Sequence, residues 1–441
     1  MSRSRRDHRE WQQSQQGATL ILALAGIVVA MVMAALAIDI STLYLARSEA
    51  QRTAEAAALA GAKAFVLSST TSDLPTSPHT VPDALAVQLV NAVLQQNLIA
   101  GRPGQLTPPL GTYPIFDYTN PGNPKITVSV QQQGLPTFFS RIWSRVPNTV
   151  TATATAEAYN PSGSSANPPV TAQCVKPFIV PNQDPGHTGF PSFIDPTTGA
   201  ITNLGRVTPF GSGVVGEGIT FNVDCAGLAP FCGSGANPPA AHSGNALDFV
   251  PAALPTGGQS CPSCGGTGTQ LEQNIACCNT TALACNSATQ GAQMNIDLTG
   301  ADPRSPVSNG LQCLIHQNPG LGMDALDPSG FPTVGGAPFR FAAGANNPLT
   351  QAPNPVVAVG NVVTTSDSII TLLIADSFNT GVSPPTADIV GYMQVFVVQD
   401  LGSGNFTGVV LNVSGCGTNA ATVPPIVGGG VSPIPVRLIH N

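Results

Sequence analysis

Ten cysteines are the residues of this chain best suited to chemistry, and all of them lie between residues 174 and 416. Cys261 and Cys264 form a C-x-x-C motif, which serves redox catalysis when the first thiolate lies at a helix N-terminus. Here Gly265-Gly266-Thr267-Gly268 follows, and such a run does not begin a helix. A zinc site is the other use of this spacing, but adjacent cysteines such as Cys277-Cys278 rarely form a tetrahedral pair. We therefore predict structural disulfides, with an extracytoplasmic thiol or metal role of the Cys261-Cys264 cluster as an alternative.

The even number of cysteines allows all of them to pair. Cys225 and Cys232 are spaced to close a small loop, whereas the stretch from residue 261 to 285 holds a dense group of five. Sequence alone does not choose among the connectivities. The candidate disulfide cysteines are Cys174, Cys225, Cys232, Cys261, Cys264, Cys277, Cys278, Cys285, Cys313 and Cys416.

Two further patterns have the residue types of a binding site. Residues 211–216 spell G-x-G-x-x-G, which binds dinucleotides only between a buried strand and a helix, and the residues after Gly216 predict a strand instead. The histidines show no H-x-x-x-H pair and no carboxylate at ligand spacing, so we expect surface or loop roles for them. The sequence thus predicts no catalytic residue, no cofactor, no metal site and no small-molecule substrate. The histidines are His8, His79, His187, His242, His316 and His440.

The composition limits the class of protein. Only 9% of residues are charged, against roughly 25% in ordinary soluble domains, and the chain has 46 glycines and 41 prolines. Much of it must therefore be turns and loops. The formal net charge is −7, and the lysines are too few to form a basic stripe, which excludes nucleic-acid binding.

Residues 17–38 contain no charged side chain, and this segment decides on which side of a membrane the rest of the chain lies. As a helix it extends about 33 Å, enough to cross a hydrocarbon core of about 30 Å. Arginines crowd the preceding tail at positions 3, 5, 6 and 9, and positive charge is retained on the cytoplasmic side. We therefore expect a single-pass protein of the bacterial cell membrane with a cytoplasmic N-terminus and an extracytoplasmic C-terminal region, where cysteines are oxidised.

A cleaved signal peptide is the alternative for this segment. Ala35-Leu36-Ala37 has the A-x-A form of a cleavage site. Against cleavage, the apolar run exceeds the usual length of about 7 to 15 residues, and the helical pattern continues beyond it. Within the run, Gly26, Ala30 and Ala34 form a small-xxx-small ridge suited to helix packing in the membrane.

The remaining chain predicts an α+β fold with one N-terminal transmembrane helix. Strands are expected at 125–131, 149–156, 178–180 and 219–223 and throughout the last ninety residues, where a small sandwich or barrel is the natural expectation. A second helix is expected from Asp83 to a stop at Gly101. The expected divisions are a basic tail (1–16), the transmembrane helix (17–38), its continuation (39–67), an α+β module (68–160), a Cys/Gly/Pro-rich, loop-rich region (161–354) and a β-rich C-terminal region (355–441).

An apolar helix ending at Asp39 is followed by a Tyr/Arg stretch, a Gln and an alanine run. In their order and spacing these features resemble the TadE/TadG-like family of Flp (tight adherence) pilus assembly proteins. The resemblance extends to about residues 16–159 through the strand and TVTATATAEA segments. It implies that the α+β module is pilin-like. In this sequence Glu55 replaces the aspartate typical of the family. The motif residues are Asp39, Tyr44, Gln51, Glu55, Ala56, Ala57 and Ala58.

This resemblance implies a structural or assembly component of a Tad/Flp-type pilus or secretion system, without catalysis. Its expected partners are the membrane and other pilus or secretion-system proteins, which it would contact through the N-terminal helix. The alternative is a secreted or surface adhesin or binding module released by signal peptidase after Ala37. Residues 161–441 lie outside the resemblance.

Overall fold

A computed structural model of the 441-residue chain describes a large part of it. The described residues are 4–75, 79–107, 113–120, 122–135, 148–163, 168–208, 211–223, 239–254, 259–260, 268–284, 292–295, 302–317, 322–326, 340–351, 357–363, 365–379, 384–417, 426–427 and 432–439. The chain forms two compact units, one of residues 1–57, 91–115 and 127–154 and the other of residues 58–90, 116–126 and 155–441. The predicted module 68–160 is thus divided between the units.

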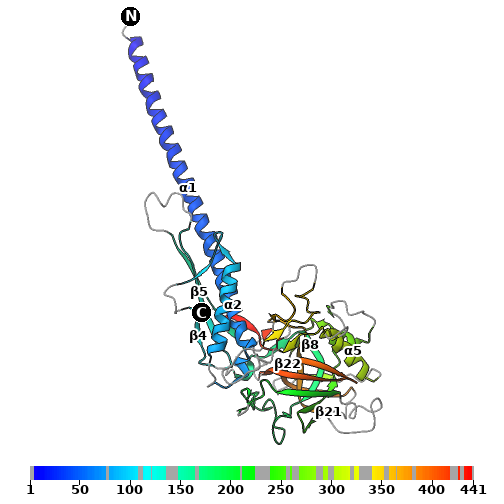
Figure 1. The fold of residues 1–441 in the computed structure, drawn as a ribbon. Helices are drawn as coiled ribbons and strands as arrows, with labels where there is room; N and C mark the ends of the chain where they lie inside the picture. Colours follow the sequence, from blue (N-terminus) through cyan, green and yellow to red (C-terminus); the bar gives the residue numbers. More distant parts are fainter. Residues whose placement is uncertain are drawn as a thin grey trace. The chain divides into compact units, whose positions relative to one another are not determined.

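One uninterrupted helix, α1 (Ser4–Leu67), opens the chain and is drawn blue in Figure 1. Its sequence has no proline, and leucine, alanine and arginine favour the helix throughout. The predicted transmembrane helix and its predicted continuation are therefore parts of the same element. A short turn of 3₁₀ helix, η1 (Thr70–Ser72), follows it.

The second helix begins and ends earlier in the chain than its sequence pattern predicts. It is α2 (Thr80–Gln96), and the prediction that it stops at Gly101 is wrong. Ala100 and Gly101, with φ of 48° and 77°, instead form the two-residue turn of a hairpin between β1 (Leu98–Ile99) and β2 (Arg102–Pro103). A turn with two positive φ angles suits the twist of hairpin strands, and glycine adopts it without strain.

The expected strands on either side of residues 136–147 are present. They are β5 (Lys125–Gln132) and β6 (Val150–Ala158), and Ser129 accepts hydrogen bonds of 2.9 Å from the hydroxyls of Thr107 and Thr153. The segment between these strands, residues 136–147, lies outside the described residues. The accompanying strands are β3 (Gln105–Leu106), β4 (Ile115–Asp117) and β25 (Val436–Ile439), which pairs with β6 from Thr155 to Ala158.

The larger unit is built on a closed ring of six strands. Their order is β11-β23-β22-β21-β8-β13, and β13 also pairs with β11, which closes the ring. Two of the neighbouring pairs, β8 with β21 and β11 with β13, are parallel, and the others are antiparallel. The ring strands are β8 (Val175–Pro181), β11 (Gly218–Val223), β13 (Ala246–Pro251), β21 (Ile369–Asn379), β22 (Thr386–Gly402) and β23 (Asn405–Gly415).

The ring strands are buried on both faces. On β8, Phe178 and Val180 belong to one apolar core and Val175 and Ile179 to another, because successive side chains point to opposite faces. This is why the sequence of β8 is apolar along most of its length rather than alternating. Four phenylalanines from four strands pack together in the first core, with ring centroids 4.7 to 5.7 Å apart, namely Phe178, Phe221, Phe249 and Phe406.

Short helices and strands lie before, between and after the ring strands in the sequence of this unit. Two helices, α4 and α5, pack on each other through Gly310, where an added Cβ would lie 2.8 Å from Ile275. The remaining described elements are η2 (Pro161–Gly163), β7 (Val170–Ala172), β9 (Val207–Thr208), β10 (Gly211–Ser212), β12 (Ala241–His242), β14 (Gln259–Ser260), α4 (Gln270–Ala276), β15 (Cys278–Asn279), β16 (Leu283–Ala284), β17 (Ala292–Asn295), α5 (Arg304–Leu314), β18 (Ala325–Leu326), β19 (Phe341–Ala342), β20 (Val362–Val363) and β24 (Ile426–Val427).

Candidate functional site

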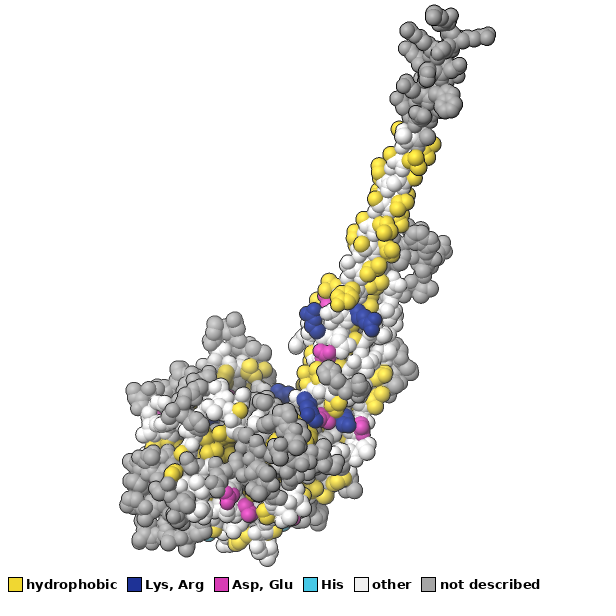
Figure 2. All heavy atoms as spheres, turned by 180° about the vertical axis from the view of Figure 1, so that it is seen from behind, with side chains coloured by type: hydrophobic (Ala, Val, Ile, Leu, Met, Phe, Trp, Pro, Cys, Tyr) yellow, Lys and Arg dark blue, Asp and Glu magenta, His cyan; other side chains and the backbone are white. Residues whose placement is uncertain are grey.

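The apolar stretch of α1 exposes nearly all of its large side chains. Leu20, Leu22 and Met33 are 70%, 71% and 64% exposed, and Figure 2 shows the yellow side chains of this stretch on the face drawn. Such exposure in water is costly, since burial of each such side chain contributes about 1.5–3 kcal/mol. Among the described residues this is the one helix whose length and composition suit a membrane crossing, and an N-terminal signal sequence shares these properties.

Two sets of small residues on α1 have opposite surroundings. Ala50, Ala54 and Ala57 are fully buried in the folded part of the chain. The predicted ridge of Gly26, Ala30 and Ala34 is exposed, and no atom lies within 4 Å of a Cβ added at Gly26. The first set therefore serves the packing of this chain itself, while the second is open to a neighbouring helix.

The predicted motif residues occupy different faces of α1. Asp39 is 3% exposed, whereas Tyr44 is 77% exposed. Gln51 donates to Glu55 across one helical turn at 2.8 Å, so these two polar residues stabilise the helix surface. The alanine run is graded in burial: Ala56 is half-buried, and Ala57 and Ala58 are fully buried.

The end of α1 is fixed to β23 by hydrogen bonds. Asn412 on β23 donates to the carbonyl of Val66 at 3.1 Å, and this carbonyl at the helix C-terminus also accepts from the amide of Ser69 at 3.1 Å. The hydroxyl of Ser72 donates to the carbonyl of Val413 at 3.0 Å and accepts from its amide at 3.1 Å. Asn160 donates to the same carbonyl at 2.9 Å. The C-terminal end of α1 therefore belongs to the larger unit.

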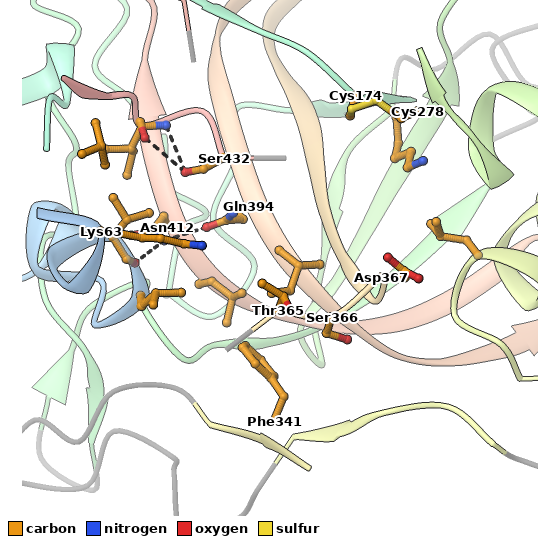
Figure 3. A pocket seen from close by; sticks show the side chains of 18 of the residues that line it. Lys63, Cys174, Cys278, Phe341, Thr365, Ser366, Asp367, Gln394, Asn412 and Ser432 are labelled. Carbon is orange, nitrogen blue, oxygen red and sulfur yellow. Dashed lines mark hydrogen bonds between the residues drawn. A yellow bond between two sulfur atoms is a disulfide. The ribbon is translucent and has the colours of Figure 1, made fainter. Parts of the chain in front are cut away.

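A cavity of about 740 Å³ lies beside this helix end, within the larger unit. Figure 3 shows Gln394 and Asn412 next to each other in its wall, joined by a hydrogen bond of 2.7 Å, with Lys63 nearby. Most of the lining is apolar. The lining residues from α1 are Leu59, Ala60, Lys63, Val66 and Leu67, and those from the β region include Phe341, Ile369, Leu411 and Ile434.

Lys176 is a buried amine in the wall of this cavity. It is 3% exposed, and its Nζ donates to the carbonyl of Cys277 at 2.7 Å. Burial lowers the pKa of Lys176 to about 7, and the charge of Asp367 opposes this effect. Its amine therefore changes charge near neutral pH.

The structure contains a disulfide between Cys174 and Cys278. This bond links the start of β8 to β15, so Cys278 pairs outside the dense group that its sequence position indicates. Cys277, Cys313 and Cys416 are also disulfide-bonded. The C-x-x-C cysteines Cys261 and Cys264, together with Cys225, Cys232 and Cys285, lie outside the described residues.

Three histidines lie next to a carboxylate in the folded chain. Nε2 of His242 lies 2.6 Å from Asp248, and Nε2 of His316 lies 3.0 Å from Asp367. Nδ1 of His187 lies 2.7 Å from Asp184. The three-residue spacing of Asp184 and His187 was a readable signal for the last pair, whereas the other two depend on strand and loop geometry.

A further carboxyl group near His187 was not found from sequence. Glu217 precedes β11 and is 3% exposed. Burial, and then the nearby charge of Asp184, raise the pKa of Glu217 to about 9. Glu217 lies 33 residues after Asp184 and 30 after His187 in the sequence, and no local pattern predicts that the three come together.

These features define a protein with an N-terminal helix suited to crossing a membrane and a mostly β region with a disulfide. Residues 17–64 match the family model described as putative Flp pilus-assembly TadE/G-like. The predicted family is thereby confirmed over this segment, which includes every motif residue from Asp39 to Ala58. No curated protein and no solved structure matches the chain. The resemblance proposed for residues 65–159 lies outside the matched segment.

Proposed function

We propose that this protein is a single-pass, envelope-anchored structural component of a Tad/Flp-type pilus or secretion system. One observation carries the proposal. Residues 17–64, which match the family model, are also the part of α1 in which exposed apolar side chains are followed by buried alanines. Its first part has the surface of a membrane helix, and its second part belongs to the folded protein. The family segment is thus the connection between membrane and folded region.

The anchor orients the chain across the membrane. The arginines before residue 17 keep the tail in the cytoplasm, and the β region then lies outside, where disulfides such as Cys174–Cys278 are stable. We assign the exposed ridge of Gly26, Ala30 and Ala34 as the surface that packs against other membrane helices of the assembly. We also propose that residues 68–160 act as a pilin-like module outside the membrane.

Two measurements test this function. The first is Edman sequencing of the mature chain from washed membranes, which should give the N-terminus upstream of residue 17. A start at Ile38 would remove the anchor and with it the proposal. The second is recovery of surface pili from cells that lack the gene and carry either the wild-type copy or one with Gly26→Leu. We expect pili with the first copy and a strong loss with the second, while both chains remain in the membrane.

The second candidate is a binding module released after Ala37. The cavity of about 740 Å³ favours it, because ligand sites are commonly concave, mostly apolar and within this size range. The unbroken course of α1 through Ala35-Leu36-Ala37 argues against release. This candidate predicts the chain in the culture medium at full yield, whereas the anchored protein stays with the membranes after a carbonate wash.

A further inference from the structure

A cluster of ionisable side chains that no proposed function uses lies where the turn after β8 meets the start of β11. Asp184 is fully buried, Glu217 is 3% exposed, and His187 is partly buried. Each offers one ligand atom, and these atoms lie within 4.8 Å of one another. Protein ligands held about 2.0–2.2 Å from one zinc ion lie somewhat closer together than this limit, so small side-chain movements bring the three atoms onto one ion.

Glu217 is the residue of this cluster whose carboxyl group is buried without a hydrogen-bond donor. Both of its carboxylate oxygens are shielded from solvent, and neither has a hydrogen-bond partner among the described residues. Buried polar groups in native proteins nearly always have a partner. The Asp184 carboxylate lies beside it, and at neutral pH the raised pKa of Glu217 leaves a proton on its carboxyl group, which a cation bound between the two side chains displaces. A positive ion between them satisfies both.

The rest of the cluster is arranged to hold Asp184 in place. Its Oδ1 accepts from the amide of Gly186 at 3.1 Å, and its Oδ2 accepts from Nδ2 of Asn203 at 2.8 Å. Both donors are uncharged. A Cβ added at Gly186 would lie 2.0 Å from Oε1 of Glu217, so glycine at this position lets the Glu217 carboxylate approach the turn.

We propose that Asp184, His187 and Glu217 bind one divalent transition-metal ion of the zinc class, which joins the turn after β8 to β11. Two carboxylates and an imidazole suit zinc, whereas calcium and magnesium take oxygen ligands almost exclusively. Gly186 and Asn203 act on the ion through Asp184, as outer hydrogen bonds commonly orient metal ligands. The site is structural and is independent of the assembly role.

The test is a titration of the full-length protein in detergent. The protein is treated with EDTA and N-ethylmaleimide without reductant, so that free thiols are blocked, and is then titrated with ZnCl₂ or CaCl₂ in a calorimeter. We expect one zinc ion per chain, a higher unfolding midpoint with zinc, and no such response to calcium. Absence of zinc binding to the folded wild-type protein, or a calcium response in its place, would overturn the proposal.

The variants assign the binding to these residues. Glu217→Gln keeps the size of the side chain and supplies an amide donor toward Asp184, so the fold should persist while zinc affinity falls at least tenfold. His242→Ala is the matched control, because it removes a histidine from an exposed pair with Asp248 and should bind zinc as the wild type does. Unchanged affinity in a folded Glu217→Gln protein contradicts the site. His187→Gln answers the same question if that variant does not fold.

Discussion

The guanidinium of Arg206 pairs with the carboxylate of Asp73, with Nε of the first 2.5 Å from Oδ2 of the second. The two side chains are only 8% and 6% exposed. Nη2 of Arg206 also donates to the carbonyl of Ser68 at 2.5 Å, just beyond the end of α1. The pair therefore fastens the segment after the N-terminal helix to the loop before β9, in addition to the hydrogen bonds to β23.

Asp73→Asn should strongly destabilise the larger unit. Removal of one partner leaves the buried Arg206 charge uncompensated, which typically costs about 3–5 kcal/mol. Guanidinium unfolding followed by circular dichroism measures the loss. Asp302→Asn is the control, since the Asp302–Arg304 pair is 41% and 51% exposed and its loss should leave the midpoint unchanged. Equal effects of the two substitutions would contradict the role of burial.

Gly26 and Gly61 should respond oppositely to the same substitution. A Cβ at Gly61 would lie 2.5 Å from Cδ1 of Ile126 and 3.0 Å from Cγ2 of Val90, whereas Gly26 has open space. Gly61→Leu overpacks the contact between α1, α2 and β5, and we expect a loss of about 1–3 kcal/mol in unfolding free energy. Gly26→Leu should leave the unfolding midpoint unchanged. A lower midpoint for Gly26→Leu would show that this position packs within the chain itself.

Lys176 should make stability rise with pH above neutrality. The folded protein releases the Lys176 proton near pH 7, while the unfolded chain holds it to about pH 10.5, so between these values the unfolded state binds more protons. The free energy of unfolding then rises by up to about 1.4 kcal/mol per pH unit from this group. Unfolding midpoints between pH 6 and pH 8.5 measure the slope.

Lys176→Met provides the comparison for this titration. It keeps the apolar length of the side chain and removes the charge, so the rise above pH 7 should become shallower than in the wild type. The loss of the bond to the Cys277 carbonyl changes the midpoint at every pH but not the slope. Equal slopes for the two proteins would mean that Lys176 does not titrate in this range.

The disulfide between Cys174 and Cys278 should contribute substantially to stability. It closes a long loop, with a sequence separation of 104, and such bonds contribute about 2–5 kcal/mol. The double substitution Cys174→Ser and Cys278→Ser should lower the denaturation midpoint accordingly. The single substitution Cys174→Ser serves as a second variant, because it leaves a thiol at Cys278 that maleimide labelling detects. A double variant as stable as the wild type would contradict this contribution.

Local patterns predicted the elements more accurately than their boundaries. The proline-free, alanine-rich sequence predicted α1, and alternation predicted β5 and β6 to within two residues. The end of α2 was predicted wrongly, because Gly101 reads equally as a helix stop and as a hairpin turn. Only the pairing of Leu98 with Pro103 distinguishes the two.

The candidate sites also differ in whether a local sequence pattern predicts them. Gly26, Ala30 and Ala34 were identified from spacing, since positions four apart share one face of a helix. The cavity beside α1 was not predicted, because its lining comes from segments between residues 59 and 436. The metal-type cluster was missed for the same reason: the Asp184–His187 spacing is local, but Glu217 joins it only through the start of β11.

By itself, the sequence determined the apolar helix and the β character of the C-terminal part, because these depend on composition and short-range periodicity. The tertiary structure decided how β8, β11 and β13 join β21, β22 and β23 in one ring, although more than a hundred residues separate the two groups. It also decided that Cys278 pairs with Cys174 and that Arg206 pairs with Asp73. Strand pairing, disulfides and buried ion pairs join residues distant in the chain, and no local pattern specifies such partners.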